Sequence, residues 1–148
     1  MKHVWSARVR AETRSASRVH ARNHTFRVGP ALSFEPTDEL PSALEHLLGA
    51  LAADVLGTLL TYARRRRIVI DDAELVLNLT LENPLVHLGV VGEEGYAGID
   101  TIDGTLYVSS DGTSSDVLAL WQEVELRSPI YNTLRRAATV SIRFVQTA

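Results

Sequence analysis

Two carboxylates that could act as acids, bases or ligands lie on the most apolar stretch of the chain. Glu45 opens this stretch and Asp54 interrupts it, among leucine, alanine, valine and glycine. On a helix, a separation of nine residues directs the two side chains about 180° apart. They therefore cannot act as a pair within one chain, and a glycosidase-like carboxylate dyad is disfavoured.

Asp54 stands between Ala53 and Val55, in a segment that we expect to be buried. A buried carboxylate must be paired, hydrogen-bonded or neutral. One interpretation is a functional acid at the floor of a pocket, which binds a cation or transfers a proton. The alternatives are a structural ion pair with an arginine, within the chain or across a dimer, and simple exposure at the helix edge. His46 lies roughly 12 Å away along such a helix, so direct contact is not expected.

Ser128 and the histidines give weaker signals. As a nucleophile Ser128 would need a histidine and an acid, and the chain has no Gly-x-Ser-x-Gly elbow. Its expected role is to cap a short helix that begins at Pro129. His20 and His24 flank a tight turn without a third ligand at suitable spacing, so no metal site is predicted. The glycines of residues 89–95 do not form a dinucleotide-binding motif, and no cofactor is predicted.

Composition limits the function classes. The chain has 148 residues, of which 45% are hydrophobic and 22% charged, as expected of one globular domain over residues 1–148. The absence of cysteine excludes disulfides, zinc–thiolate sites and thiol chemistry. The formal net charge of −3 argues against a general nucleic-acid surface, and we expect no nucleic-acid partner. The first residues lack the apolar core of a signal peptide, so a cytoplasmic location is expected.

Residues 47–63 have nearly the length and composition of a membrane span, and four arginines follow at residues 64–67. Asp54, near the middle, would cost about 2.5–3.5 kcal/mol to insert into a bilayer. We therefore predict a buried helix of a soluble protein and no membrane partner. The arginines are interpreted as a solvated helix end, where cations complement the helix dipole; a nucleic-acid or anionic-lipid patch is the alternative.

The elements that must position these residues form an α+β pattern. Strands are expected at residues 4–12, 17–21 and 25–28, followed by a loop and a long helix over residues 41–66, with Asp38 or Ser42 as its cap. Further strands are expected at residues 74–81 and 102–109, with an irregular glycine-rich loop over residues 85–99 between them. Helices at residues 117–127 and 129–136 and a closing strand at 138–145 complete the order β-β-β-α-β-β-α-α-β.

The long helix carries two different faces. One is apolar at helical spacing, and its members are Leu44, Leu47, Leu48, Leu51, Val55, Leu59 and Tyr62. The other has small residues three or four apart, which let a second helix approach closely: Ala50, Ala53, Gly57 and Thr61. The chain has no second long helix, so we predict a homodimer in which this helix pairs with its copy. The alternative is that the small face packs under the shorter C-terminal helices.

Two motifs in this order resemble the OsmC/Ohr family, over about residues 4–146. The first is the helix that opens Pro-Ser-Ala-Leu-Glu-His-Leu-Leu-Gly-Ala-Leu at residue 41. The second is the C-terminal half, with the strand at 102–109, the helix through Trp121 and then Ser-Pro-Ile-Tyr-Asn-Thr-Leu from residue 128. The resemblance implies an intertwined α+β homodimer with an OsmC-like fold and two long central helices.

The resemblance also implies where a reactive site would lie. Family members are thiol peroxidases that reduce organic hydroperoxides with an attacking and a resolving cysteine, assisted by a glutamate and an arginine. By register, the attacking cysteine falls at Asp54 and the resolving cysteine at Ser128. Glu45 is one residue from the family's glutamate position, and Arg18 or Arg14 corresponds to the arginine. Neither a carboxylate nor a hydroxyl can cycle through sulfenic acid and disulfide, so the peroxidase reaction is not expected.

Three function classes remain from the sequence. The first is a homodimer that binds a small hydrophobic ligand at its interface, without catalysis. The second is an enzyme of another class that uses Asp54 with an arginine or a histidine as acid and base. The third is a structural homologue with no ligand.

Overall fold

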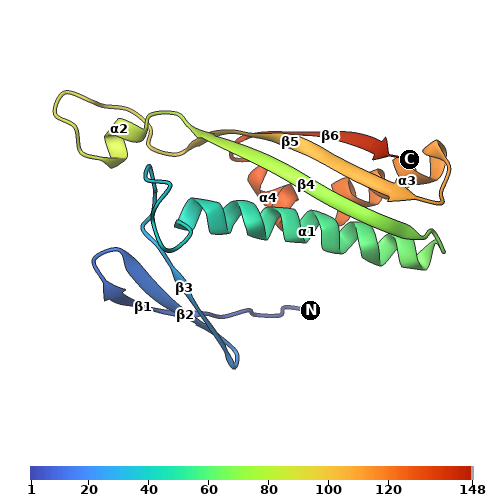
Figure 1. Ribbon diagram of the computed structural model, residues 1–148, viewed down its shortest axis with the longest axis horizontal. Coiled ribbons are helices and arrows are strands. Elements are labelled where there is room, and N and C mark those ends of the chain that lie inside the picture. Colours follow the sequence, from blue (N-terminus) through green and yellow to red (C-terminus); the bar gives the residue numbers. More distant parts are fainter. Residues whose placement is uncertain (148) are drawn as a thin grey trace. The chain divides into compact units, whose positions relative to one another are not determined.

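A computed structural model describes residues 1–147 of the chain (Figure 1). The chain divides into two compact units, Met1–Gly49 and Ala50–Ala148, and the boundary lies within the long helix. The order of elements is β-β-β-α-β-α-β-α-α-β, so the predicted α+β order is confirmed with one additional short helix.

The first unit begins with an antiparallel sheet of three strands. These are β1 (Arg8–Thr13), β2 (Ala16–Ala21) and β3 (His24–Val28), in the order β1-β2-β3. Val9, Val19 and Phe26 are directly opposite one another and share one face, since opposed residues of an antiparallel pair lie on the same side. Within the described chain Val9 is 57% exposed and Phe26 is 45% exposed, so this apolar face is largely uncovered.

Helix α1 (Ala43–Arg65) starts in the first unit, where its free backbone N–H groups are all accounted for locally. The Ala43 and Leu44 amides donate to the carbonyls of Pro30 and Ala31, at 3.0 and 3.3 Å. Ser42 and Glu45 form a reciprocal capping box: the Glu45 amide donates to Ser42 Oγ, and Glu45 Oε1 accepts from the Ser42 amide at 3.0 Å. The predicted cap at Ser42 is therefore confirmed.

The two predicted faces of α1 differ in burial as the spacing indicated. Leu51, Val55 and Leu59 are fully buried. The face with small residues is exposed over its length, at Ala50, Ala53, Gly57 and Thr61. By length and composition α1 is the one described helix that could cross a membrane, yet only 17% of its apolar window is buried in this chain.

The second unit holds a mixed sheet of three strands with helices on one face (Figure 1). β4 (Ile70–Leu81) pairs antiparallel with β5 (Ile99–Ser110), which pairs parallel with β6 (Thr139–Thr147). The parallel pair is connected through α3 (Ser114–Arg127) and α4 (Pro129–Leu134). The inner face brings together buried residues of the sheet and of α3: Ile102, Leu106, Val108, Val117, Leu120, Trp121 and Val124.

Three elements differ from the sequence-based boundaries, two of them for local reasons. β4 begins at Ile70, because Asp71 and Asp72 lie exposed beside an irregularity in the ladder and do not interrupt it. A short helix, α2 (Pro84–His87), lies inside the expected loop, since Asn83 Oδ1 accepts from the Leu85 amide and caps it. β1 begins at Arg8, four residues later than expected.

The capping box of α1 predicts a pH-dependent contribution to stability. Hydrogen bonds from the backbone and then the hydroxyl of Ser42 lower the pKa of Glu45 below its ordinary value of 4.5. Its stabilisation is therefore complete above pH 4.5 and is lost as the pH falls through the lowered pKa. Ser42→Ala should reduce the free energy of unfolding by about 1 kcal/mol at neutral pH, and the difference from wild type should shrink in acid.

Urea unfolding between pH 3 and 7 measures this, with Ser115→Ala on α3 as an exposed-serine control. A difference that stays constant across that range would exclude the ionised Glu45 from the cap.

Candidate functional site

The site is centred on Asp54, which lies half-buried in the middle of α1. Its Oδ2 accepts two backbone hydrogen bonds, from Ile130 at 2.9 Å and from Tyr131 at 3.0 Å. Both donors belong to the first turn of α4, where an N–H group has no partner inside its own helix. Asp54 thus acts as the side-chain cap of α4, supplied by a residue 76 positions earlier in the chain.

The remaining donors of that turn are also satisfied. Pro129 has no N–H group, and the Asn132 amide donates to the Ser128 carbonyl at 3.0 Å. No N–H group of this turn is therefore available to Ser128, and the Ser128 side chain makes no cap hydrogen bond. The prediction that Ser128 caps α4 was wrong, because Asp54 already occupies both donors.

Ser128 is fully buried, and its Oγ has no hydrogen-bond partner among the described residues. A buried hydroxyl without a partner is uncommon, since desolvation is then not compensated. The structure therefore brings the Asp54 and Ser128 positions to one place, the N-terminus of α4. It gives them unequal roles: the carboxylate is hydrogen-bonded twice and the hydroxyl is free.

The ion pair with an arginine, one of the alternatives for Asp54, does not form within residues 1–147. Arg18 instead binds Glu12, at 2.9 Å, and Glu12 also binds Arg27 at 2.8 Å. Glu45 is held by Ser42 in the capping box. These two candidate site residues thus have partners other than Asp54.

His46 follows Glu45, and its Nε2 is buried without a partner among the described residues. The ring stacks on Phe26, with the centroids 5.6 Å apart. Residues that precede His46 in the sequence, from the loop of residues 33–41 together with Glu45, line a cavity of about 390 Å³. His20 and His24 form no metal cluster with other residues of the described chain.

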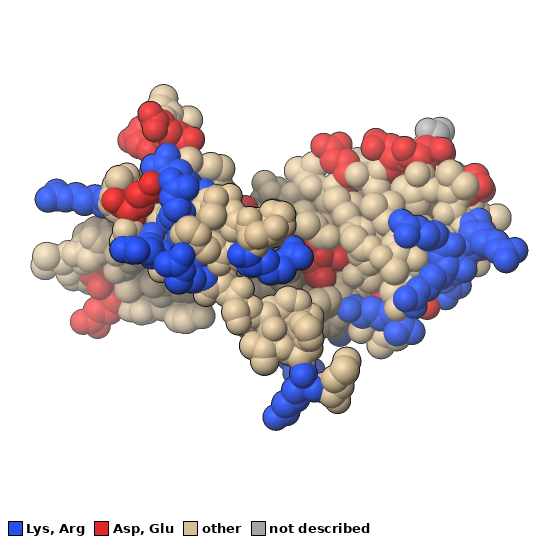
Figure 2. Space-filling model, turned by 90° about the horizontal axis from the view of Figure 1, so that it is seen from below, with Lys and Arg blue, Asp and Glu red and all other residues tan. Residues whose placement is uncertain are grey.

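The arginines at the end of α1 form a cluster that the sequence did not predict in detail. The guanidinium groups of Arg65 and Arg127 lie over the Tyr62 ring, 4.8 and 4.9 Å from its centre. Glu123 of α3 binds Arg66 at 2.9 Å and also Arg127, which joins α3 to the end of α1. Figure 2 shows this basic end of the helix at the right. The signal available in the sequence was the spacing of Glu123 and Arg127, four residues apart on one helix.

Removal of the Asp54 carboxylate should loosen α4. Asp54→Ala leaves the amides of Ile130 and Tyr131 without an acceptor and should lower the free energy of unfolding by about 1–3 kcal/mol. Asp54→Asn keeps one acceptor oxygen and should lose less. Thermal or urea unfolding measures both, with Asp103→Ala, at an exposed aspartate on β5, as the control expected within about 0.5 kcal/mol of wild type. Equal stability of Asp54→Ala and the control would contradict the capping role.

Comparison with known proteins places this geometry in a family. The sequence profile of the OsmC-like protein family matches residues 36–143. No curated protein matches the chain in sequence. Among solved structures, the OsmC-like protein from Mycoplasma pneumoniae is similar over 100% of both chains, with a TM-score of 0.82 and 18% identity.

Two further structures have the same fold at low identity. The OsmC-like protein of unknown function from Vibrio cholerae covers 97% of this chain and 100% of its own, with a TM-score of 0.76 and 12% identity. The organic hydroperoxide resistance protein OhrB of Bacillus subtilis covers 95% of this chain and 98% of its own, with a TM-score of 0.63 and 17% identity. With the family profile matched over most of its length and no cysteine in its sequence, this chain belongs to the OsmC-like protein family as a divergent, cysteine-free member.

Proposed function

We propose that this protein is a soluble, cytoplasmic homodimer that binds a small organic ligand in an apolar pocket between two copies, without peroxidase chemistry. The observation that supports it most is the exposed face of α1. This face is apolar or small at Ala53, Gly57 and Leu60, yet nothing in the described chain covers it.

A second copy would also explain why residue 57, on the exposed face of α1, is a glycine. A Cβ atom at this position would meet no atom within 4 Å, so packing inside the chain does not require a glycine. Glycine in a helix interior lowers stability by roughly 0.5–1 kcal/mol relative to alanine. A partner helix that approaches at this point would explain the glycine, because a small residue lets two backbones come close.

The apolar face of the first sheet supports the same proposal. Val9 and Phe26 are exposed in one chain, and a three-stranded sheet with an uncovered apolar face is incomplete as a folding unit. A second copy would cover both this sheet and α1. Apolar surface from two chains around the half-buried Asp54 would form a pocket for a small molecule with an apolar body.

The contacts of Asp54 favour binding over acid–base catalysis. Its Oδ2 is held by two amide donors, which fixes the carboxylate as an acceptor at the start of α4. Ser128 is fully buried, so a ligand between two copies would meet the half-buried Asp54 and not the Ser128 hydroxyl. Asp54 therefore suits the orientation of a polar group on a bound ligand.

Charge at the exposed face of α1 should break the dimer. Leu60→Arg places a guanidinium where the partner helix is proposed to lie, and should convert the protein to a monomer with a mass near 16.3 kDa. Leu118→Arg, at a leucine on α3 that is 57% exposed against 45% for Leu60, is the matched control and should remain a dimer. Light scattering after size exclusion measures both. A wild-type monomer, or equal effects of the two changes, would contradict the proposed interface.

Native mass spectrometry of gently purified protein tests the ligand directly. The expected result is a dimer that retains a small organic molecule, in wild type and in Asp54→Asn alike. A bare dimer that gains no mass from a screen of small apolar compounds would contradict ligand binding. A pH-dependent activity abolished by Asp54→Asn would favour the acid–base alternative.

A further inference from the structure

The charge of this chain is divided sharply along its length. Residues 1–28 contain six arginines and one lysine against a single acid, Glu12, a formal charge of +6. The remaining residues, 29–148, contain eight basic and 17 acidic residues, a formal charge of −9. The net charge of −3 for the whole chain is therefore the sum of two parts of opposite sign. This net charge alone argued against a nucleic-acid surface.

The first sheet arranges four of these arginines on one face. Arg10 of β1, Arg18 of β2 and Arg27 of β3 are opposed in register and form a row across all three strands. Arg8 and His20 are opposed in a neighbouring row. They lie on the same face as Arg10 and Arg18, because each is two positions from one of these along its strand. The opposite face carries the apolar Val9, Val19 and Phe26, so the sheet is basic on one side and apolar on the other.

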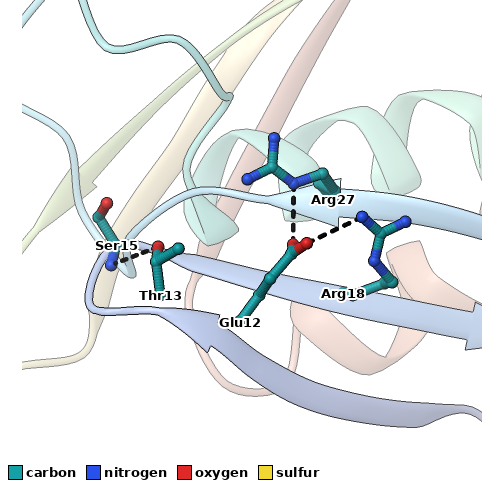
Figure 3. A network of polar contacts seen from close by, with 5 residues as sticks. All are labelled: Glu12, Thr13, Ser15, Arg18 and Arg27. Atoms are coloured by element: carbon teal, nitrogen blue, oxygen red, sulfur yellow. Dashed lines mark hydrogen bonds and ion pairs between the residues drawn. The ribbon is translucent and has the colours of Figure 1, made fainter.

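The basic face is only partly neutralised. Glu12 reaches across the strands to bind Arg18 and Arg27, as Figure 3 shows, and these two cations lower the pKa of Glu12. Within residues 1–147, Arg8 and Arg10 make no ion pair. Like charges that are directly opposed in a sheet destabilise it, so an anion bound beside Arg8 and Arg10, where Glu12 makes no ion pair, would stabilise the sheet.

The composition of this face fits a phosphodiester backbone. Its cations are arginines, whose planar guanidinium groups bind phosphate oxygens through two parallel hydrogen bonds. Apolar and aromatic side chains, which would enter a bilayer or stack on bases, lie on the other side of the sheet. We propose that the basic face of β1–β3 (Arg8, Arg10, Arg18 and Arg27) binds the backbone of nucleic acid without sequence preference.

Fluorescence anisotropy with a labelled single-stranded oligonucleotide and its duplex tests this proposal. Wild type should bind both, more weakly as salt rises from about 50 to 200 mM, because backbone contacts release counterions. Arg8→Ser with Arg10→Ser should weaken binding about tenfold or more at low salt. The same pair should reduce the slope of log affinity against log salt by about 1.4–1.8, the value for two lost phosphate contacts.

Arg64→Ser with Arg67→Ser is the matched control, since it removes two charges from the basic end of α1. The control should bind nearly as wild type, and circular dichroism should show that both variants are folded. Absence of binding by wild type, or equal losses in the two variants, would overturn the proposal. Binding of vesicles that contain an anionic phospholipid, with no binding of either oligonucleotide, would overturn it as well.

Discussion

The structure depends on one constraint: a 23-residue apolar helix needs more cover than one chain of this length supplies. Hydrophobic burial is the dominant favourable term in folding, and it acts only on surface that is removed from water. On one side of α1, Leu51, Val55 and Leu59 are fully buried, while the side with small residues is exposed to solvent. A bilayer or a second copy of the chain could supply the missing cover. The half-buried Asp54 and the family to which the chain belongs favour the second copy.

Asp54 connects this helix to the rest of its unit. At this position the family resemblance expects a cysteine that reacts with peroxides, and the chain instead has a carboxylate that accepts two amide hydrogen bonds from α4. These two hydrogen bonds satisfy amides of α4 that have no partner inside their own helix. The same change leaves Ser128 without a helix-capping role. The two positions that the resemblance assigns to the cysteines therefore lie together at the N-terminus of α4.

Local patterns in the sequence predicted most of the architecture. The 3.6-residue spacing of leucines indicated α1 and its buried side, and Ser42 was one of the two residues expected to cap it. Alternation indicated β4, although not its first residues, because exposed aspartates at the start of a strand look like a turn. Asn83 and Pro84 looked like the end of a strand, while the same pair is also a good start for the short helix α2.

The candidate site could be predicted only in part. The resemblance indicated that Asp54 and Ser128 belong together, but the hydrogen bonds of Asp54 come from residues 76 and 77 positions later, beyond any local pattern. For the same reason Ser128 was assigned a capping role that a distant carboxylate performs. The partners of Arg18 depended on the register of three strands, which the spacing of residues alone does not determine.

A crystal structure of protein purified gently from cells would show whether two copies share a ligand site. We expect two copies with their α1 helices in contact at Ala53 and Gly57, Asp54 bound to the amides of α4, and density for a small organic molecule beside it. A monomer with this face of α1 in solvent, or a dimer formed through other elements, would contradict this expectation.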